Sequence, residues 1–325
     1  MNLTLVTGAT GFVGWHVARR LLDRGERVRI LVRNAARARE LAPAEVLAGD
    51  LRDPASVRTA VAGCTAVYHV AADYRLWVRD RAAMFATNVE GTRNVLEACR
   101  QAGVERVVYT STVGCIGIPE GGVGREEMEA REEDMTGPYK RSKFLAERLA
   151  LDFARQGLPV VIVNPTAPVG DHDFKPTPTG RVIVDYVRGG MPAYLDTGLN
   201  LVDIRDVAEG HLLAFARGRP GERYILGCRN MTLREIFAAL EAMSGVPAPR
   251  WRIPYPVALA FAFASTGWAG VVGGTPRAPL DGVRMARKKM FVSHEKARRE
   301  LGFEPGPVED ALERAVAWFR ANGYC

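Results

Sequence analysis

The chain begins with an apolar run, Leu3-Thr4-Leu5-Val6, which leads through Thr7 into the turn Gly8-Ala9-Thr10-Gly11-Phe12-Val13-Gly14. A short apolar run followed by glycines spaced G-x-x-G-x-x-G indicates a buried strand, a tight turn and the start of a helix. Glycine lets the backbone approach a pyrophosphate closely, and unpaired N–H groups at the helix N-terminus stabilise its negative charge. The stretch therefore predicts a dinucleotide-binding turn that contacts the cofactor through Gly8, Thr10, Gly11, Phe12, Val13 and Gly14. A glycine-rich turn without a ligand is the alternative.

Short β-branched runs alternate with helix-length amphipathic segments through the first half of the chain. We predict strands at Leu3–Val6, Arg27–Val32, Ala66–Val70, Arg106–Thr110 and Pro159–Val163, and helices at Val13–Arg24, Pro54–Val61, Met84–Ala102 and Tyr139–Gln156. This alternation is typical of a doubly wound, parallel α/β sheet (a Rossmann fold) of at least about six strands with right-handed crossovers. We expect the dinucleotide-binding domain to span residues 1–165, with 201–217 rejoining it, and residues 166–325 to form a smaller, interleaved substrate lobe.

Composition narrows the class of protein further. The net charge of +7 comes from arginines spread along the chain rather than gathered in a basic block, so we expect no nucleic-acid partner. The five cysteines are widely spaced, with no C-x-x-C pair, and we expect no metal site.

With no export signal evident at the N-terminus, we expect a cytoplasmic enzyme. Val257–Gly274 carries no charge. We favour a buried helix of the substrate lobe there, with peripheral membrane contact through Pro256–Val272 as the alternative.

The residues after the second predicted strand bear on the choice of cofactor. Arg33 stands where an acidic residue would accept the hydroxyls of the adenosine ribose. An arginine there can pair with a 2′-phosphate, which favours NADP(H), although NAD(H) is possible if Arg33 is merely a solvated strand end. Asp50, in Gly49-Asp50-Leu51, is a candidate partner of the adenine amino group, and capping of its own turn is the alternative.

Tyr139 and Lys143 are four residues apart at the start of a predicted helix, so their side chains share one face. A neighbouring ammonium group stabilises a phenolate and makes tyrosine a better acid or base. Thr112 follows the strand Arg106–Thr110 and would lie at the carboxyl edge of the sheet, where it could orient the reacting oxygen; Ser111 is the alternative. We predict that Tyr139, Lys143 and Thr112 form the catalytic set.

Taken together, these motifs resemble the extended short-chain dehydrogenase/reductase superfamily of NAD(P)-dependent epimerases, dehydratases and dihydroflavonol-type reductases. The resemblance also includes Tyr68-His69-Val70-Ala71-Ala72, Asn88-Val89-Glu90-Gly91-Thr92, Asn164-Pro165 and Asn200–Ala208. It implies that Ala71 and Ala72 pass beneath the cofactor, that Asn88 supports the catalytic geometry, and that Pro165 and Val169 border the nicotinamide. With Asp50, it also places Leu51 at the cofactor. The segments Asn164–Gly170, Lys175–Arg181 and Asp196–Asn200 look most like those of hopanoid-associated sugar epimerases.

The function expected from these residues is hydride transfer on a sugar or lipid-linked polyol, of the epimerase or dehydratase type. An NADPH-dependent carbonyl reductase of the dihydroflavonol type is the first alternative, and a non-catalytic dinucleotide sensor or scaffold is the second. Candidate substrate contacts from loops are Tyr74, Lys175 and Arg277. By analogy with the superfamily, a homodimer would form through the helices near Met84–Ala102 and Tyr139–Gln156.

Overall fold

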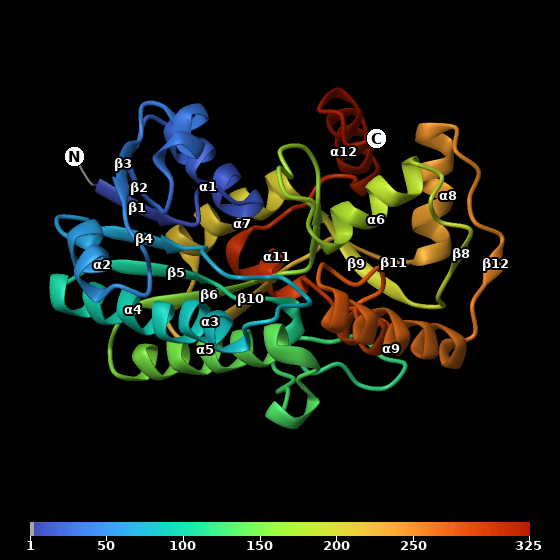
Figure 1. Cartoon of the computed structure of the whole chain (residues 1–325). Helices are drawn as coiled ribbons and strands as arrows, with labels where there is room; N and C mark the ends of the chain where they lie inside the picture. The colour runs from blue at the N-terminus through green and yellow to red at the C-terminus, as the bar shows by residue number, and fades with distance from the viewer. Residues whose placement is uncertain (1–2) are drawn as a thin grey trace.

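A computed structural model describes residues 3–325 of the chain. Its centre is a seven-stranded sheet in the order β10-β6-β5-β4-β1-β2-β3, and every pairing in it is parallel. Figure 1 shows this sheet sandwiched between two layers of helices. The predicted doubly wound α/β fold is therefore confirmed. The strands are β1 (Leu3–Thr7), β2 (Arg27–Val32), β3 (Glu45–Ala48), β4 (Ala66–His69), β5 (Arg106–Thr110), β6 (Val160–Pro165) and β10 (Arg223–Leu226).

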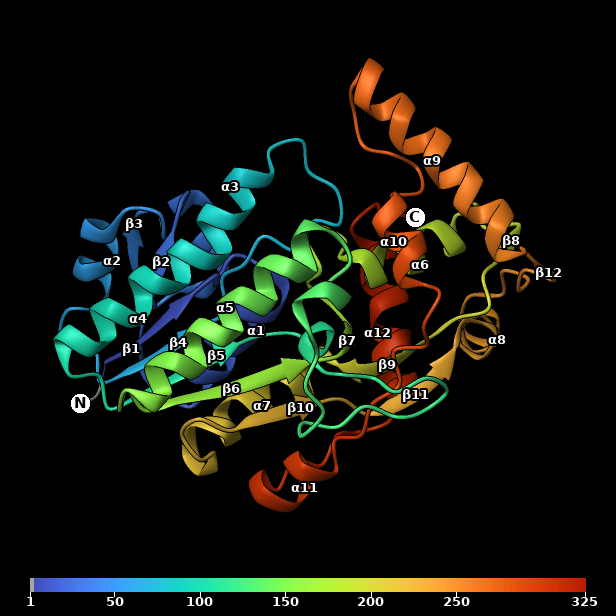
Figure 2. The ribbon, with the colours of Figure 1, turned by 90° about the horizontal axis from the view of Figure 1, so that it is seen from below.

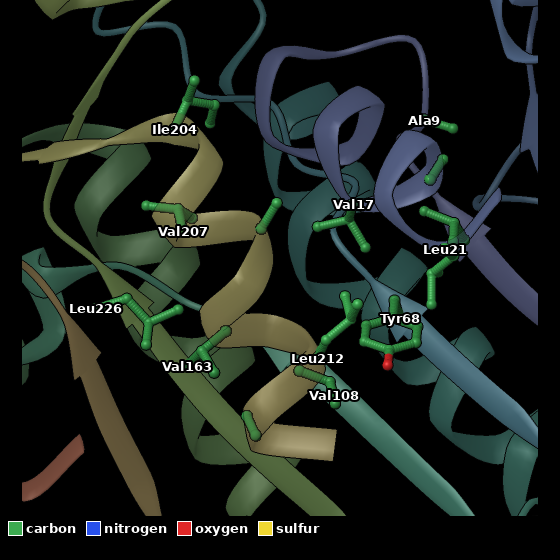
Figure 3. Packing of buried hydrophobic residues seen from close by; sticks show 14 of the residues in the cluster. Ala9, Val17, Leu21, Tyr68, Val108, Val163, Ile204, Val207, Leu212 and Leu226 are labelled. Atoms are coloured by element: carbon green, nitrogen blue, oxygen red, sulfur yellow. The ribbon is translucent and has the colours of Figure 1, made fainter. Parts of the chain in front are cut away.

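One face of the sheet packs against α1 (Phe12–Asp23) and α7 (Ile204–Arg217). Figure 3 shows the contact, with Val17 and Leu21 of α1 facing Leu212 of α7 across Tyr68 of the sheet. Residues from both halves of the sequence thus share one apolar core, and burial of such side chains is the main stabilising contribution to the fold. α11 (Glu295–Leu301) extends this layer beside α7 and β10.

The opposite face is covered by α2 (Pro54–Val61), α4 (Gly91–Ala102) and α5 (Gly137–Arg155). The helix predicted over Met84–Ala102 is divided in the structure. A short α3 (Arg81–Phe85) and a π-helical turn, η2 (Ala86–Glu90), precede α4. Turns of this kind occur often at functional sites because the extra residue redirects the side chains around it. Here the turn holds the buried Asn88.

The second lobe has a core of its own. A three-stranded sheet of β7 (Ala167–Val169), β9 (Gly198–Asp203) and β11 (Arg229–Thr232) packs with α6 (Pro178–Val187), α8 (Leu233–Ser244) and α12 (Val308–Ala321). Two short strands, β8 (Ala193–Tyr194) and β12 (Trp251–Arg252), pair beside it. The remaining short helical turns are η1 (Ala35–Leu41), η3 (Val113–Cys115) and η4 (Glu132–Asp134). Between β9 and β11 the chain returns to the first lobe to form α7 and β10, so the two lobes are interleaved.

The charge-free segment does not form the core helix that we favoured. It folds into α9 (Tyr255–Val272), followed by α10 (Leu280–Met285). Figure 2 shows α9 extending away from the rest of the chain. Within the described residues it is the one helix long and apolar enough to cross a membrane, and only 17% of it is buried. The prediction failed because an apolar segment of this length satisfies the sequence criteria for a core helix and for an exposed one equally well.

A buried ion pair fastens the last strand of the sheet to the helix that carries Tyr139. Arg223 Nη1 on β10 lies 3.2 Å from Glu147 Oε1 on α5, and the side chains are only 15% and 4% exposed. We expect Arg223→Ala to lower the free energy of unfolding by about 3 kcal/mol, because it leaves Glu147 buried without its cation.

Urea denaturation measures this loss, and Arg229→Ala is the matched control. Arg229 pairs with Glu309, but these side chains are 53% and 44% exposed. Removal of such a surface pair costs less than about 1 kcal/mol. If the two variants lost equal free energy of unfolding, the buried pair would stabilise the fold no more than the exposed pair does.

Candidate active site

A cavity of about 450 Å³ lies at the carboxyl edge of the parallel strands, between the two lobes. Most of the predicted site residues line it. They are Gly8, Thr10, Gly11, Phe12, Val13, Gly14, Arg33, Asp50, Leu51, Ala71, Ala72, Tyr74, Thr112, Tyr139, Lys143, Pro165 and Lys175. Segments more than 150 residues apart in the sequence are thus gathered at the edge where open α/β sheets bind ligands.

The glycine turn has the close contacts that a dinucleotide site requires. Gly8 has a φ of +75°, and a Cβ added to it would lie 2.7 Å from the Cα of Ala71. A Cβ on Gly14 would lie 2.2 Å from the carbonyl oxygen of Gly8. The N-cap of α1 is Gly11, which offers no side chain to the free N–H groups of the first turn. Backbone donors therefore face the cavity without a competing side-chain acceptor, which fits a diphosphate.

Positive charge gathers at the end of the cavity beside β2. Arg33, Arg37 and Lys175 all line it, although Lys175 comes from the second lobe. Burial lowers the pKa of Lys175, and the neighbouring charges of Arg37 and Arg33 lower it further. The structure thus places Lys175, which we predicted as a substrate contact, with the arginines of the predicted adenosine end.

Asp50 lies at the same end, but its carboxylate is already engaged. Its Oδ1 accepts from the backbone N–H of Arg52 at 2.9 Å, and its Oδ2 pairs with the Arg52 guanidinium at 2.7 Å. These bonds, chiefly that from the Arg52 side chain, hold the pKa of Asp50 below its usual value. The arrangement corresponds to the turn-capping alternative.

Tyr139 and Lys143 project from the first turns of α5 into the cavity. Burial raises the pKa of Tyr139 to about 12, while a hydrogen bond with Thr112 lowers it. Tyr139 is therefore a neutral proton donor at pH 7. The Ser111 hydroxyl instead donates to Cys115 Sγ at 3.6 Å. Of the two candidate hydroxyl residues, Thr112 is the one whose side chain lowers the pKa of the phenol.

Lys143 is almost fully buried, and its exposure is 2%. Its Nζ donates to the hydroxyl of Tyr109 at 2.9 Å and to the carbonyl of Thr110 at 2.8 Å. Burial lowers the pKa of Lys143 to about 8. Its ammonium is thus held in place at the strand end and remains the major form at pH 7.

A buried chain of hydrogen bonds joins the glycine turn to the catalytic helix. Thr92 Oγ1 donates to the carbonyl of Asn88 at 2.7 Å, so it accepts from His69 Nε2 at 3.0 Å. This assigns His69 Nδ1 as the acceptor from Thr7 Oγ1, at 2.8 Å. Burial lowers the pKa of His69 to about 3, so the ring stays neutral.

The chain continues through the π-helical turn to α5. Asn88 Nδ2 donates to Ser142 Oγ at 2.9 Å, and Ser142 Oγ donates to the carbonyl of Tyr139 at 2.8 Å. The side-chain oxygen of Asn88 also accepts from the backbone N–H of Asp73 at 2.7 Å. Asn88 lies outside the cavity lining, so it is placed to position other residues rather than to contact the cofactor.

Asn164 supports Thr112 from the next strand. Its Nδ2 donates to the carbonyl of Thr112 at 3.0 Å and to Glu147 Oε2 at 2.7 Å. Sequence reasoning assigned no role to Glu147, although its position four residues beyond Lys143 places it on the same face of α5. The buried ion pair with Arg223 is therefore connected to the predicted orienting residue.

Besides Asn88, two further predicted residues, Val169 and Arg277, lie outside the cavity lining. Val169 is 2% exposed in the core of the second lobe and does not line the cavity. Arg277 is exposed in the loop after α9, also outside the cavity. Both assignments required the path of a loop, which local residue patterns do not define.

Other lining residues were not predicted, including Leu76, Thr87, Thr177, Thr179 and Met285. They come from loops, helix ends and the π-helical turn η2, without a sequence signal. The Tyr74 hydroxyl donates to the carbonyl of Lys175 at 3.2 Å, which joins two of these loops beside the cavity.

Among the described residues, one cluster has the composition of a metal site. Donor atoms of His16, Asp171 and His172 lie within 4.8 Å of one another. Asp171 pairs with Arg205 at 3.2 Å, and its carbonyl binds His16 Nε2 at 2.9 Å. Two of the donor atoms, His16 Nε2 and Asp171 Oδ2, therefore have partners, and the nearby guanidinium disfavours a cation, so we interpret the cluster as structural.

Comparisons with known proteins agree with this geometry. The NAD dependent epimerase/dehydratase family matches residues 4–227. A protein of Synechocystis sp., provisionally named dihydroflavonol 4-reductase, is 45% identical over 98% of this chain and 95% of its own length. Sterol demethylase protein B of Methylococcus capsulatus is 38% identical over 98% of this chain and 99% of its own length. The solved UDP-glucose 4-epimerase of Thermus thermophilus, a complex with NAD, is similar with a TM-score of 0.78 at 26% identity, and the match covers 98% of this chain and 99% of that chain.

Burial of Lys143 makes stability depend on pH. Its pKa is about 8 in the folded protein, whereas lysine in an unfolded chain has a pKa of about 10.4. Between these values the unfolded chain binds more protons, so stability rises with pH. We expect the wild-type protein to gain about 2 kcal/mol relative to Lys143→Met between pH 8 and about pH 10.

Urea denaturation over this pH range tests the expectation, with Lys288→Met as the control for loss of an exposed lysine. Parallel stability curves for the wild-type protein and Lys143→Met would show that Lys143 keeps an ordinary pKa.

Proposed function

Because the chain belongs to the NAD dependent epimerase/dehydratase family, we propose that it is an NADPH-dependent oxidoreductase acting on a carbonyl or carbinol of an apolar, lipid-like substrate. The observation that carries the proposal is the single cavity that brings Tyr139, Lys143 and Thr112 together with the glycine turn. A binding protein would need the glycine turn but not this acid–base set.

The preference for NADPH is supported by the three cations at one end of the cavity. Arg33, Arg37 and Lys175 reach it from both lobes. The neutral hydroxyls of an unphosphorylated ribose would not need three cations, whereas a 2′-phosphate with nearly two negative charges would bind them well. Asp50 does not compete for the ribose hydroxyls, because Arg52 holds its carboxylate.

Each catalytic residue then has a distinct task. When bound, the dinucleotide would supply the hydride and its electron pair. Tyr139 would donate its phenolic proton to the substrate oxygen, and Thr112 would hold that oxygen in place. Lys143 would stabilise the resulting phenolate and bind a ribose hydroxyl. In the oxidative direction, Tyr139 would take the proton back from the carbinol.

Apolar side chains line the side of the cavity next to α10. α10 packs beside the start of α5, with Asp281 next to Gly137, and its last residue, Met285, lines the cavity. Leu76 and Pro168 line it as well. Since the cations of this cavity, apart from Lys143, gather at the opposite end, a diphosphate-bearing substrate would find few partners there. The two curated relatives carry names that refer to a dihydroflavonol and to a sterol, in keeping with an apolar substrate.

A sugar or polyol epimerase is the second candidate. It is favoured by the family description, by the similarity to UDP-glucose 4-epimerase and by the hopanoid-associated segments of the sequence. The same catalytic residues would serve it, with the hydride returned to the other face of a keto intermediate. The candidates differ in stoichiometry: a reductase consumes one NADPH per product, whereas an epimerase shows no net consumption.

The cofactor preference can be tested by fluorescence titration with NADPH and NADH. We expect Arg33→Asp to raise the dissociation constant for NADPH by about 100-fold, because a repulsive charge replaces a phosphate partner. Lys175→Gln should raise it by about tenfold, and NADH binding should change little in either variant. Arg39→Gln is the control, because Arg39 is exposed and outside the cavity lining. Equal effects on both cofactors would refute recognition of the 2′-phosphate.

The catalytic assignment predicts a specific effect of Tyr139→Phe. We expect kcat for carbonyl reduction to fall by about 1,000-fold, because the proton donor is lost. NADPH affinity should remain within about twofold, since the phenol is not a phosphate ligand. Single-turnover NADPH oxidation with a panel of cyclic ketones measures the change. A variant that retains the wild-type rate would remove Tyr139 from the mechanism.

A further inference from the structure

α9 exposes more large apolar side chains than any other part of the described chain. Of the nine large hydrophobic residues with high exposure, six lie on this helix and Trp251 lies just before it. The helix residues are Val257 (58%), Phe261 (56%), Phe263 (53%), Trp268 (70%), Val271 (86%) and Val272 (61%). The buried positions of α9 are all alanines, Ala258, Ala262 and Ala269. Thus α9 contacts the body through small side chains and presents its large ones outward, as an interaction surface does.

The charges that flank α9 in the sequence are mainly positive. Residues 247–280 contain no aspartate or glutamate, while Arg250 and Arg252 precede the helix and Arg277 follows it. Beyond it, Arg284 of α10 pairs with Asp281, and the basic residues that follow, Arg287 and Lys288, extend the positive region. Within the part of the chain that the structure describes, Arg250, Arg277, Arg287 and Lys288 form no ion pair, although Arg252 pairs with Asp196. An apolar helix bordered by free cations matches a bilayer surface with anionic headgroups.

The connections of α9 favour a helix that lies in the interface over one that crosses the bilayer. β12, just before the helix, pairs with β8 of the second lobe. After the helix the chain turns back, and the N–H groups of Ala278 and Leu280 bond the hydroxyls of Ser265 (3.3 Å) and Thr266 (3.1 Å). α10, which follows, returns to the body beside Leu76 and Gly137, so the segments on both sides of the helix are held by the same body. Figure 2 shows the far end of α9 reaching beyond that body.

We propose that α9 docks this protein onto an anionic membrane surface, with Trp268, Val271 and Val272 inserted among the acyl chains. Tryptophan is suited to this position because its indole ring is apolar yet carries an N–H group that can reach the headgroups. Arg250 and Arg277 contact the lipid phosphates.

The surface is also continuous with the cavity. α10 packs on α9 and ends at the cavity-lining Met285. Gly282 of α10 lies beside Leu76, another lining residue, and Gly273 at the end of α9 lies beside Arg79 of the same loop as Leu76. If the proposed function holds, an amphiphilic substrate passes from the bilayer to Tyr139 past these residues. The docking itself does not require that function.

Vesicle flotation with the full-length protein tests the docking. We expect the wild-type protein to float with vesicles containing phosphatidylglycerol and to bind pure phosphatidylcholine far less. Trp268→Glu should lower the partition coefficient by about tenfold or more, since a charge replaces the inserted ring. Val46→Glu is the matched control, because Val46 is exposed on β3 at the other edge of the molecule. Arg250→Gln/Arg277→Gln should lower binding to the anionic vesicles alone.

Light scattering of the same variants tests the alternative that a second copy of this chain, rather than a membrane, covers α9. A wild-type dimer that Trp268→Glu converts to a monomer, without vesicle binding, would assign α9 to a contact between two copies and overturn the proposal. Wild-type flotation unchanged in Trp268→Glu would also overturn it. NADPH binding, measured in parallel, should be unaffected by Trp268→Glu. If the protein fails to bind vesicles but still oxidises NADPH, the proposed function stands and the docking proposal fails. If it binds vesicles but does not oxidise NADPH, the docking proposal stands and the proposed function fails.

Discussion

The close contact between Gly14 and the carbonyl of Gly8 is the constraint on which the rest of the site depends. No side chain fits there, because a Cβ on Gly14 would lie 2.2 Å from that oxygen. The contact lets α1 start directly at the end of β1, so that its free N–H groups point over the sheet edge. α1 also packs against α7, which places the second half of the chain against the same sheet.

The chemistry depends on buried polar groups that are almost all paired. His69 and Asn88 join the strand before the glycine turn to the backbone of Tyr139, while Asn164 and Glu147 hold the backbone of Thr112. Such groups are costly to bury unpaired, so each fixes the position of its partner. Burying the charged Lys143 is also costly, and this cost lowers the pKa of its ammonium group. Stability and catalytic geometry are therefore coupled in this protein.

The second lobe contributes fewer of the residues that line the cavity, yet they bear on what the cavity accepts. Lys175 brings a cation to the adenosine end, and Met285 brings an apolar side chain to the substrate end. Met285 belongs to the helix that packs on the exposed α9. A single continuous segment thus links the surface proposed to meet the membrane with the cavity proposed to hold a lipid-like substrate.

By itself, the sequence determined the local part of this protein. β2, β5 and α2 have the predicted bounds, and the other predicted strands and α5 differ by one or two residues, because hydrophobic period and glycine spacing are local properties. It also singled out the glycine turn and Tyr139, Lys143 and Thr112, which the structure brings together in one cavity. Only the tertiary structure decided that four residues, Arg223–Leu226, complete the sheet, that Val169 and Arg277 lie outside the cavity, and that Lys175 joins Arg33. It also decided that α9 is exposed rather than buried. The physical reason is the same in each case: loop paths, and the choice between core and surface for an apolar helix, depend on contacts between residues distant in the chain.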